Sequence, residues 1–291
     1  MAPTGADEPF YYSIETHYGA SDHMVFNDWG VQVPGIMMIV WPDQWYHTSG
    51  DRIDKADPTQ LKRVAIIGAA AAYTVANADD DMAVRLAGEI ASNATRRLGH
   101  QFIMGQERLN EAEADNLARQ YRWARAHVEG TVMAEKETLE SVMELAENEQ
   151  QVGDYVSEMQ RVVDAIGGAH LEALESHMEA VAGSLGVSPV RLRMSEMERR
   201  AAGIVPRQTA LVKRDGYRGW GDHLSAVPED VRARYPYEGL ASTGELQLLV
   251  DGRHSVLDIK TMLDAQMRTT SDLQSILNYL EVLKAAGLVE M

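Results

Sequence analysis

The chain has 291 residues, of which 45% are hydrophobic and 24% are charged, close to the averages of globular proteins. This composition excludes a largely disordered chain, and no apolar run reaches the ~20 residues that cross a membrane. The formal net charge of −17 opposes a polyanionic partner, so we expect no nucleic-acid ligand and no membrane partner. Because the chain has no cysteine, disulfides, thiolate zinc sites and a cysteine nucleophile are excluded.

The first 82 residues contain the predicted strand and the first predicted helix. The residues V-P-G-I-M-M-I-V at 33–40 form a short apolar run after a turn signal, which predicts a buried strand. After a polar loop, Asp57 is the predicted N-cap of a helix, with Pro58 at its first position and Gln60 completing a capping box. We expect this helix to run to about Asn77 and to pack on a sheet through its run of glycine and alanine.

The middle of the chain, from Met82 to about Gly203, is rich in Ala, Glu, Met and Arg. Apolar residues recur there at three- and four-residue steps, which predicts long amphipathic helices. A segment from Glu107 to about Gln150, if unbroken, would be ~60 Å long, so we expect an antiparallel arm or an oligomer contact. Gly167-Gly168 is the predicted break.

The amphipathic arm, residues 107–183, exposes an apolar stripe that a small α/β subdomain cannot cover. Burying this stripe favours pairing with another helix, within the chain or across a two-fold axis. We therefore expect the arm to mediate self-association into a homo-oligomer.

The last fifty residues show a pattern of three short helices, with a capping box from Ser271 to Gln274 and a stop at Gly287. This pattern resembles a small winged-helix module. Its would-be recognition helix, residues 272–286, carries two acidic residues against one lysine, so DNA binding is not favoured. The predicted division of the whole chain is residues 1–82, an α/β part; 83–205, a helical arm; 206–240, a linker; and 241–291, a winged-helix-like module.

Two motifs in the first part carry the chemistry: G-A-S-D-H-M-V-F at 19–26 and W-P-D-Q-W-Y-H-T-S-G-D at 41–51. With the predicted strand between them and D-P-T-Q-L at 57–61, they resemble, in order, the C-terminal part of the M28 zinc aminopeptidase family. The resemblance covers about residues 8–78. It implies an α/β fold, the C-terminal part of a zinc-exopeptidase-like sheet domain, and a metallopeptidase in which two zinc ions activate the water that hydrolyses N-terminal peptide bonds.

The resemblance also implies roles for individual residues. His47 matches the last histidine ligand of the zinc site, although a lone histidine is more often structural. Tyr46 matches a catalytic position from which a phenol polarises the substrate carbonyl, the alternative being packing beside Trp45. Asp22 and His23 are expected in the loop that folds over the site, near the substrate and the metal ligands. The alternative is that Asp22 caps a turn and His23 hydrogen-bonds a neighbour.

Asp51 and Asp54 are expected to hold the second motif through backbone hydrogen bonds. In the helical region, His170 and His177 lie ~10 Å apart along one helix face, too far to bind one ion together, and are expected to be solvated or to pack.

The chain departs from the family pattern before residue 19, where it lacks the H-x-D pair, the Glu-Glu pair and the further acidic ligand. One histidine cannot hold two zinc ions at the usual coordination of four. We therefore expect the C-terminal part of a longer peptidase, inactive alone and acting on peptide substrates in its full-length form. No signal-peptide pattern is visible, and the compartment is left open. The alternative is a non-catalytic interaction or scaffold protein with a peptidase-like remnant, and metal content separates the two.

Overall fold

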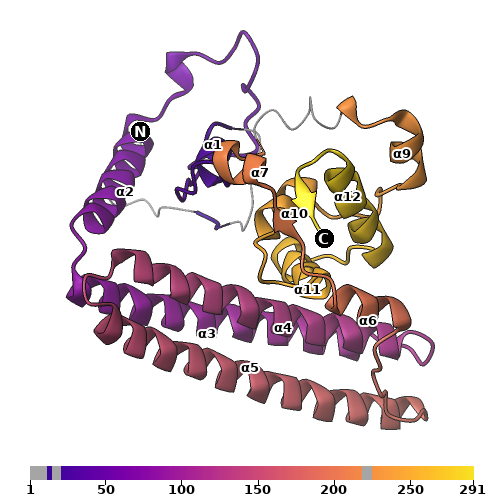
Figure 1. The fold of residues 1–291 in the computed structure, drawn as a ribbon. Coiled ribbons are helices and arrows are strands. Elements are labelled where there is room, and N and C mark those ends of the chain that lie inside the picture. The colour runs from indigo at the N-terminus through magenta and orange to yellow at the C-terminus, as the bar shows by residue number, and fades with distance from the viewer. Residues whose placement is uncertain (1–11, 15–20, 218–224) are drawn as a thin grey trace.

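The computed structural model describes residues 12–14, 21–217 and 225–291 of the chain. It is mostly helical, and the strands of the described part are β1 (Arg207–Gln208) and β2 (Val289–Glu290), which pair antiparallel. Three long helices lie side by side, the C-terminal helices pack on them, and α2 stands apart from both groups (Figure 1). The expected α/β fold with a sheet domain is therefore wrong.

The N-terminal segment, which we define as residues 12–78, contains α1 (His23–Asn27), the 3-10 turn η2 (Ile53–Lys55) and α2 (Pro58–Ala76). Residues 33–40 form no strand, and none of the described residues before Ala83 is buried. The predicted buried strand is thus wrong for this chain. A strand needs a neighbour for its backbone N–H and C=O groups, and the described residues provide none beside this segment.

Helix α2 begins and ends where the sequence predicts. The Asp57 carboxylate accepts the backbone N–H groups of Thr59 at 2.8 Å and Gln60 at 3.4 Å, and Pro58 takes the first helical position. Residues 64–76 carry no charged side chain, yet no α2 residue is buried. Among the described helices, none combines the length and the hydropathy needed to cross a membrane. The large apolar side chains that α2 exposes are Leu61, Ile66, Ile67, Tyr73 and Val75.

The three long helices form an up-down-up bundle of α3 (Asp80–Asn110), α4 (Leu117–Glu140) and α5 (Glu149–Leu185), with the 3-10 turn η3 (Ser141–Leu145) before α5. The α3 helix starts because the Asp79 carboxylate accepts the Met82 N–H. Alanine recurs along its buried face, so the three backbones can approach closely. Gly105 is a contact point of all three: a Cβ there would lie 3.0 Å from Ala124 of α4 and 3.1 Å from Leu174 of α5.

The arm is not one continuous helix. The chain leaves the helical path between α3 and α4 and again between α4 and α5, so the segment from Glu107 to Gln150 is broken twice. Its apolar stripe packs within the bundle core of the same chain. Gly167 does not break α5: it allows α5 to approach α4, since a Cβ there would lie 2.3 Å from Val132 Cγ2.

The C-terminal module, which we define as the described residues of 196–291, has its own core. Leucine and isoleucine side chains of its last three helices provide half of the buried residues of this core, and the β1–β2 pair joins its two ends. Asp272, rather than Ser271, caps the last helix, and Gly287 ends it with a φ of +74°, as predicted. Residues 218–224 of the expected linker lie outside the described part. The helices of the module are α6 (Glu196–Ala202), α7 (Ala210–Asp215), α9 (Glu229–Arg234), α10 (Thr243–Leu249), α11 (Val256–Met267) and α12 (Leu273–Ala285).

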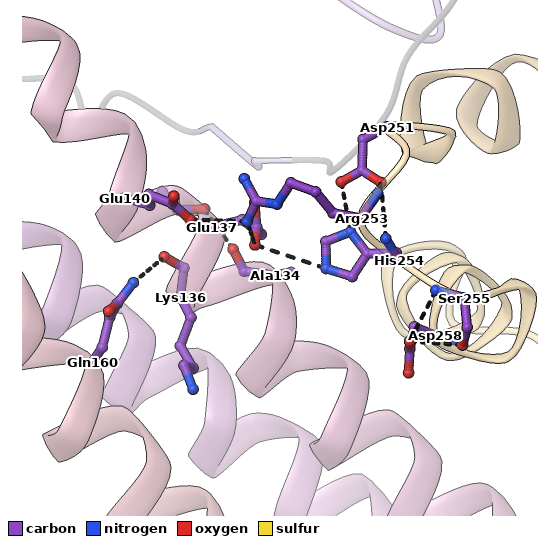
Figure 2. Close-up of polar contacts among 11 residues, drawn as sticks. Ala134, Lys136, Glu137, Glu140, Gln160, Asp251, Arg253, His254, Ser255 and Asp258 are labelled. Carbon is purple, nitrogen blue, oxygen red and sulfur yellow. Dashed lines mark hydrogen bonds and ion pairs between the residues drawn. The ribbon is translucent and has the colours of Figure 1, made fainter. Parts of the chain in front are cut away.

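The module packs on the bundle through α11, which crosses α4. A polar cluster beside this crossing joins the two parts (Figure 2). Arg253 contacts Glu137 at 2.7 Å and Glu140 at 3.0 Å, and the His254 ring lies between Asp251, at 2.7 Å, and Glu137, at 3.7 Å. The module and the bundle therefore have complementary charges where they meet.

Candidate functional site

The second motif folds into a loop that its own polar groups hold. Asp43 accepts the backbone N–H of Trp45 at 2.8 Å. The Thr48 hydroxyl donates to the Trp45 carbonyl at 2.7 Å and accepts the Gly50 N–H at 3.1 Å. Asp54, expected to bind the loop backbone, instead pairs with the Lys55 ammonium at 2.8 Å. Tyr46 and His47 thus lie on the turn between Trp45 and Gly50, with their side chains exposed.

Tyr46 and His47 lie together at the tip of this loop. Their rings stack with centroids 3.8 Å apart, and the Trp41 ring meets the Tyr46 ring edge-on at 5.7 Å. His47 has a φ of +58°, a backbone conformation that costs a residue with a side chain of order 1 kcal/mol or more and is found often at functional sites. Both side chains are exposed, so the imidazole and the phenol are accessible from solvent.

Asp22 and His23 lie at the other end of the segment 33–40. Asp22 takes the N-cap position of α1 without a side-chain cap, and His23 begins the helix. The helix is tied to Gly35, whose N–H donates to Asn27 Oδ1 and whose carbonyl accepts from Asn27 Nδ2 at 3.1 Å. The first two residues of this motif, Gly19 and Ala20, lie outside the described part.

The described residues do not form a zinc site by themselves. No three side chains of His, Cys, Asp or Glu gather in the described ranges in a way that could hold a metal ion. His170 stacks on Phe102 with centroids 4.8 Å apart, and burial lowers its pKa. His177 contacts Asn110 Oδ1 at 2.8 Å. Neither histidine replaces the missing ligands.

Asp28 and Trp29, which no sequence motif marks, follow the first motif and join the N-terminal segment to the C-terminal module. Asp28 Oδ1 accepts the backbone N–H of Tyr217 at 2.8 Å, and the Trp29 indole N–H donates to the Gln247 carbonyl at 3.2 Å. The aromatic residue and the adjacent glycine in D-W-G could have marked a contact, but nothing local could have identified partners about 190 residues away.

Comparison with known proteins gives one finding on this segment. Residues 1–72 match the family model of Peptidase family M28. The match ends inside α2 and includes both motifs, so this part of the chain is related to the M28 peptidases. No curated protein and no solved structure matched the chain.

Proposed function

We propose that the N-terminal segment is the C-terminal part of a zinc aminopeptidase of the M28 type, which in its complete form hydrolyses N-terminal peptide bonds. The observation that carries the proposal is the family match over residues 1–72, which includes the loop with the left-handed His47 at its tip. A peptide is the substrate of the complete enzyme.

In this proposal His47 is one of the zinc ligands, and the other ligands come from outside the described residues. One imidazole is not enough for either zinc ion, so this chain alone is inactive. The Tyr46 hydroxyl donates a hydrogen bond to the substrate carbonyl oxygen, where negative charge develops during hydrolysis. Asp22 and His23 face the substrate from the other motif.

The exposed apolar surface of the N-terminal segment supports the proposal that another part of a peptidase domain covers it in the complete enzyme. Residues 33–40 expose side chains on both sides of the chain, including Ile36 at 71%, and α2 is apolar around most of its circumference. A helix that is apolar all round is normally buried, and a continuous apolar strand belongs in a sheet covered on both faces. The remainder of a peptidase sheet would cover both elements.

A non-catalytic interaction protein is the second candidate function. It is favoured by the incomplete ligand set among the described residues and by the large folded part, bundle plus module, that lies outside the family match. Binding of nucleic acid is not part of either candidate. Most residues of α12, the expected recognition helix, are buried in the module core, so this helix has little surface to offer a DNA groove.

A zinc titration of the whole chain tests the ligand role. We expect at most one weakly bound zinc ion after dialysis and no turnover of an aminoacyl-nitroanilide. His47→Ala removes the weak binding, whereas His177→Ala, the matched control on α5, retains it. One zinc ion bound with equal affinity by the His47→Ala and unmodified chains would contradict the ligand role, and two tightly bound ions with turnover would contradict the incomplete site.

A further inference from the structure

The strongest contact between the N-terminal segment and the rest of the chain is centred on one carboxylate. Asp28 Oδ1 accepts two backbone N–H groups, from its neighbour Trp29 at 2.7 Å and from Tyr217 at 2.8 Å. The Asp28 carbonyl also accepts the N–H groups of Val31 at 2.9 Å and Gln32 at 2.8 Å. Asp28 thus shapes the turn after α1 and attaches that turn to the module.

The two backbones meet so closely that glycine is required on both sides. A Cβ on Gly30 would lie 2.6 Å from the backbone of Asp215 and Gly216. A Cβ on Gly216, whose φ is +69°, would lie 2.5 Å from the Asp28 carboxylate. At Gly30 the contact is with backbone atoms and cannot be relieved by a side-chain rotation, whereas at Gly216 the positive φ disfavours any residue with a side chain. The fit is therefore specific to this pair of turns.

Trp29 adds an apolar contact to the hydrogen bonds. Its ring packs against the core of the module, which includes Tyr217, only 3% exposed. Beside it lies an open depression of about 350 Å³, lined on one side by residues of the segment such as Trp29 and Val33 and on the other by Leu248 of α10. The Asp28 carboxylate, the Trp29 indole and the two glycines together form a specific interface.

The position of this interface relates it to the candidate site. It precedes residues 33–40, and the loop of Tyr46 and His47 follows them. Beyond Gly35 most large apolar side chains of the segment are exposed. The interface therefore fixes the start of the polypeptide that leads to the metal-binding loop.

We propose that the C-terminal module is a clamp for the peptidase-like segment, with Asp28 as the positioning residue that the module binds. The module recognises the turn after α1 through the Tyr217 N–H on the Asp28 carboxylate, the partly buried Trp29 indole, and the close approach of Gly30 to Gly216. This assigns the module an intramolecular protein partner. That the clamp helps to position His47, which follows this turn in the chain, rests on the proposed function.

Hydrogen exchange of the whole chain tests the clamp. In Asp28→Ala the Tyr217 amide loses its acceptor and the turn is released. The amides of Val31, Gln32, Val33, Gly35 and Tyr217 therefore exchange about tenfold faster or more, while α3 to α5 are unchanged. Asp28→Asn retains Oδ1 and restores the protection. The proposal is overturned if the backbone amides around Val33 exchange freely in the unmodified chain. It is also overturned if these amides exchange at the same rate in Asp28→Ala as in Asp28→Asn.

Crosslinking provides a second readout, because the chain has no cysteine of its own. A chain with Val33→Cys and Leu248→Cys should be joined rapidly by a short bis-maleimide, since both side chains line the same depression. Ile53→Cys with Leu248→Cys is the control, because Ile53 is 88% exposed on η2. Equal rates for the two pairs would refute the clamp. Neither readout involves zinc or substrate, so a failed zinc titration leaves this test unaffected.

Discussion

His127 is a buried histidine that the folded chain keeps neutral. Its ring stacks on Trp123 with centroids 3.5 Å apart, and its Nδ1 lies 2.9 Å from the Trp123 carbonyl oxygen. It is 1% exposed, and burial lowers its pKa from 6.5 to about 4. Between these pH values the unfolded chain binds a proton that the folded chain does not. The free energy of unfolding therefore falls as the pH drops through this window, by roughly 3 kcal/mol from this group.

We expect His127→Phe to remove that part of the pH dependence. Phenylalanine keeps an aromatic ring against Trp123 but cannot be protonated. Urea unfolding at pH 7 and pH 4.5 measures the difference, with His177→Phe, at a half-buried histidine of α5, as the control. If the His127→Phe and unmodified chains lose the same free energy between the two pH values, this histidine is not held neutral.

Single residues show which contacts a sequence can reveal. Asp57 and Gly287 were predicted correctly because a helix start and a helix stop depend on hydrogen bonds within three or four residues. The loop of His47 was predicted from its motif, and its stacked rings involve neighbours in sequence. Asp28 was missed because its partner, Tyr217, is brought near by the fold alone.

At the scale of helices, the crossing of α4 and α11 depends on Gly130. A Cβ there would lie 2.2 Å from the Thr261 carbonyl oxygen and 2.8 Å from Ala265 Cβ. We expect Gly130→Ala to destabilise the chain by about 1 to 3 kcal/mol, because the backbone of α11 must move away. Gly99→Ala, at a position of α3 with nothing within 4 Å, should instead stabilise by about 0.5 to 1 kcal/mol.

Thermal unfolding of the two variants measures both effects. If the melting temperature falls in Gly130→Ala and rises in Gly99→Ala, the result supports a crossing in which Gly130 allows the backbones of α4 and α11 to make contact. A Gly130→Ala chain as stable as Gly99→Ala would show that the module does not rest on α4 at this point.

Helices were easier to predict than their surroundings. The apolar spacing around Leu117 and Val128 identified α4, since a helix is defined by its own periodicity. The segment 33–40 was predicted as a strand on an equally apolar pattern, but a strand needs hydrogen bonds from another segment. Gly167 was misread for a related reason: its role is set by Val132 on a different helix, and composition alone suggested a break.

For the whole molecule, we expect the bundle and the module to fold without the N-terminal segment. The buried residues of both cores begin at Ala83, and Trp29 is the partly buried apolar contributor from the described part of the segment. A chain of residues 79–291 should melt within a few degrees of the full chain, and it should bind less of a dye that detects exposed apolar surface. A large loss of cooperative unfolding would contradict this division.

The structure limits where the self-association proposed for the arm could take place: the outer face of the bundle. The bundle core uses the inward stripe of each helix, so an oligomer contact must use outer positions such as Ile103, 53% exposed on α3. We expect Ile103→Glu to reduce the mass measured by light scattering, whereas Ile53→Glu in the N-terminal segment does not. A full chain that is already monomeric at micromolar concentration rules the proposal out.

The bundle has an odd number of long helices, so the chain enters it at one end and leaves at the other. The 31 residues of α3 place these points about 46 Å apart at 1.5 Å per residue. The module must turn back along the bundle to reach Asp28, which closes the chain into a ring. The bundle is then a rigid covalent connection between the turn after α1 and the turn at Gly216. Its length sets the effective concentration at which these two turns meet. A backbone cut between Asn77 and Asp79 would open the ring, and one carboxylate, one indole and two glycines would have to hold two separate molecules together.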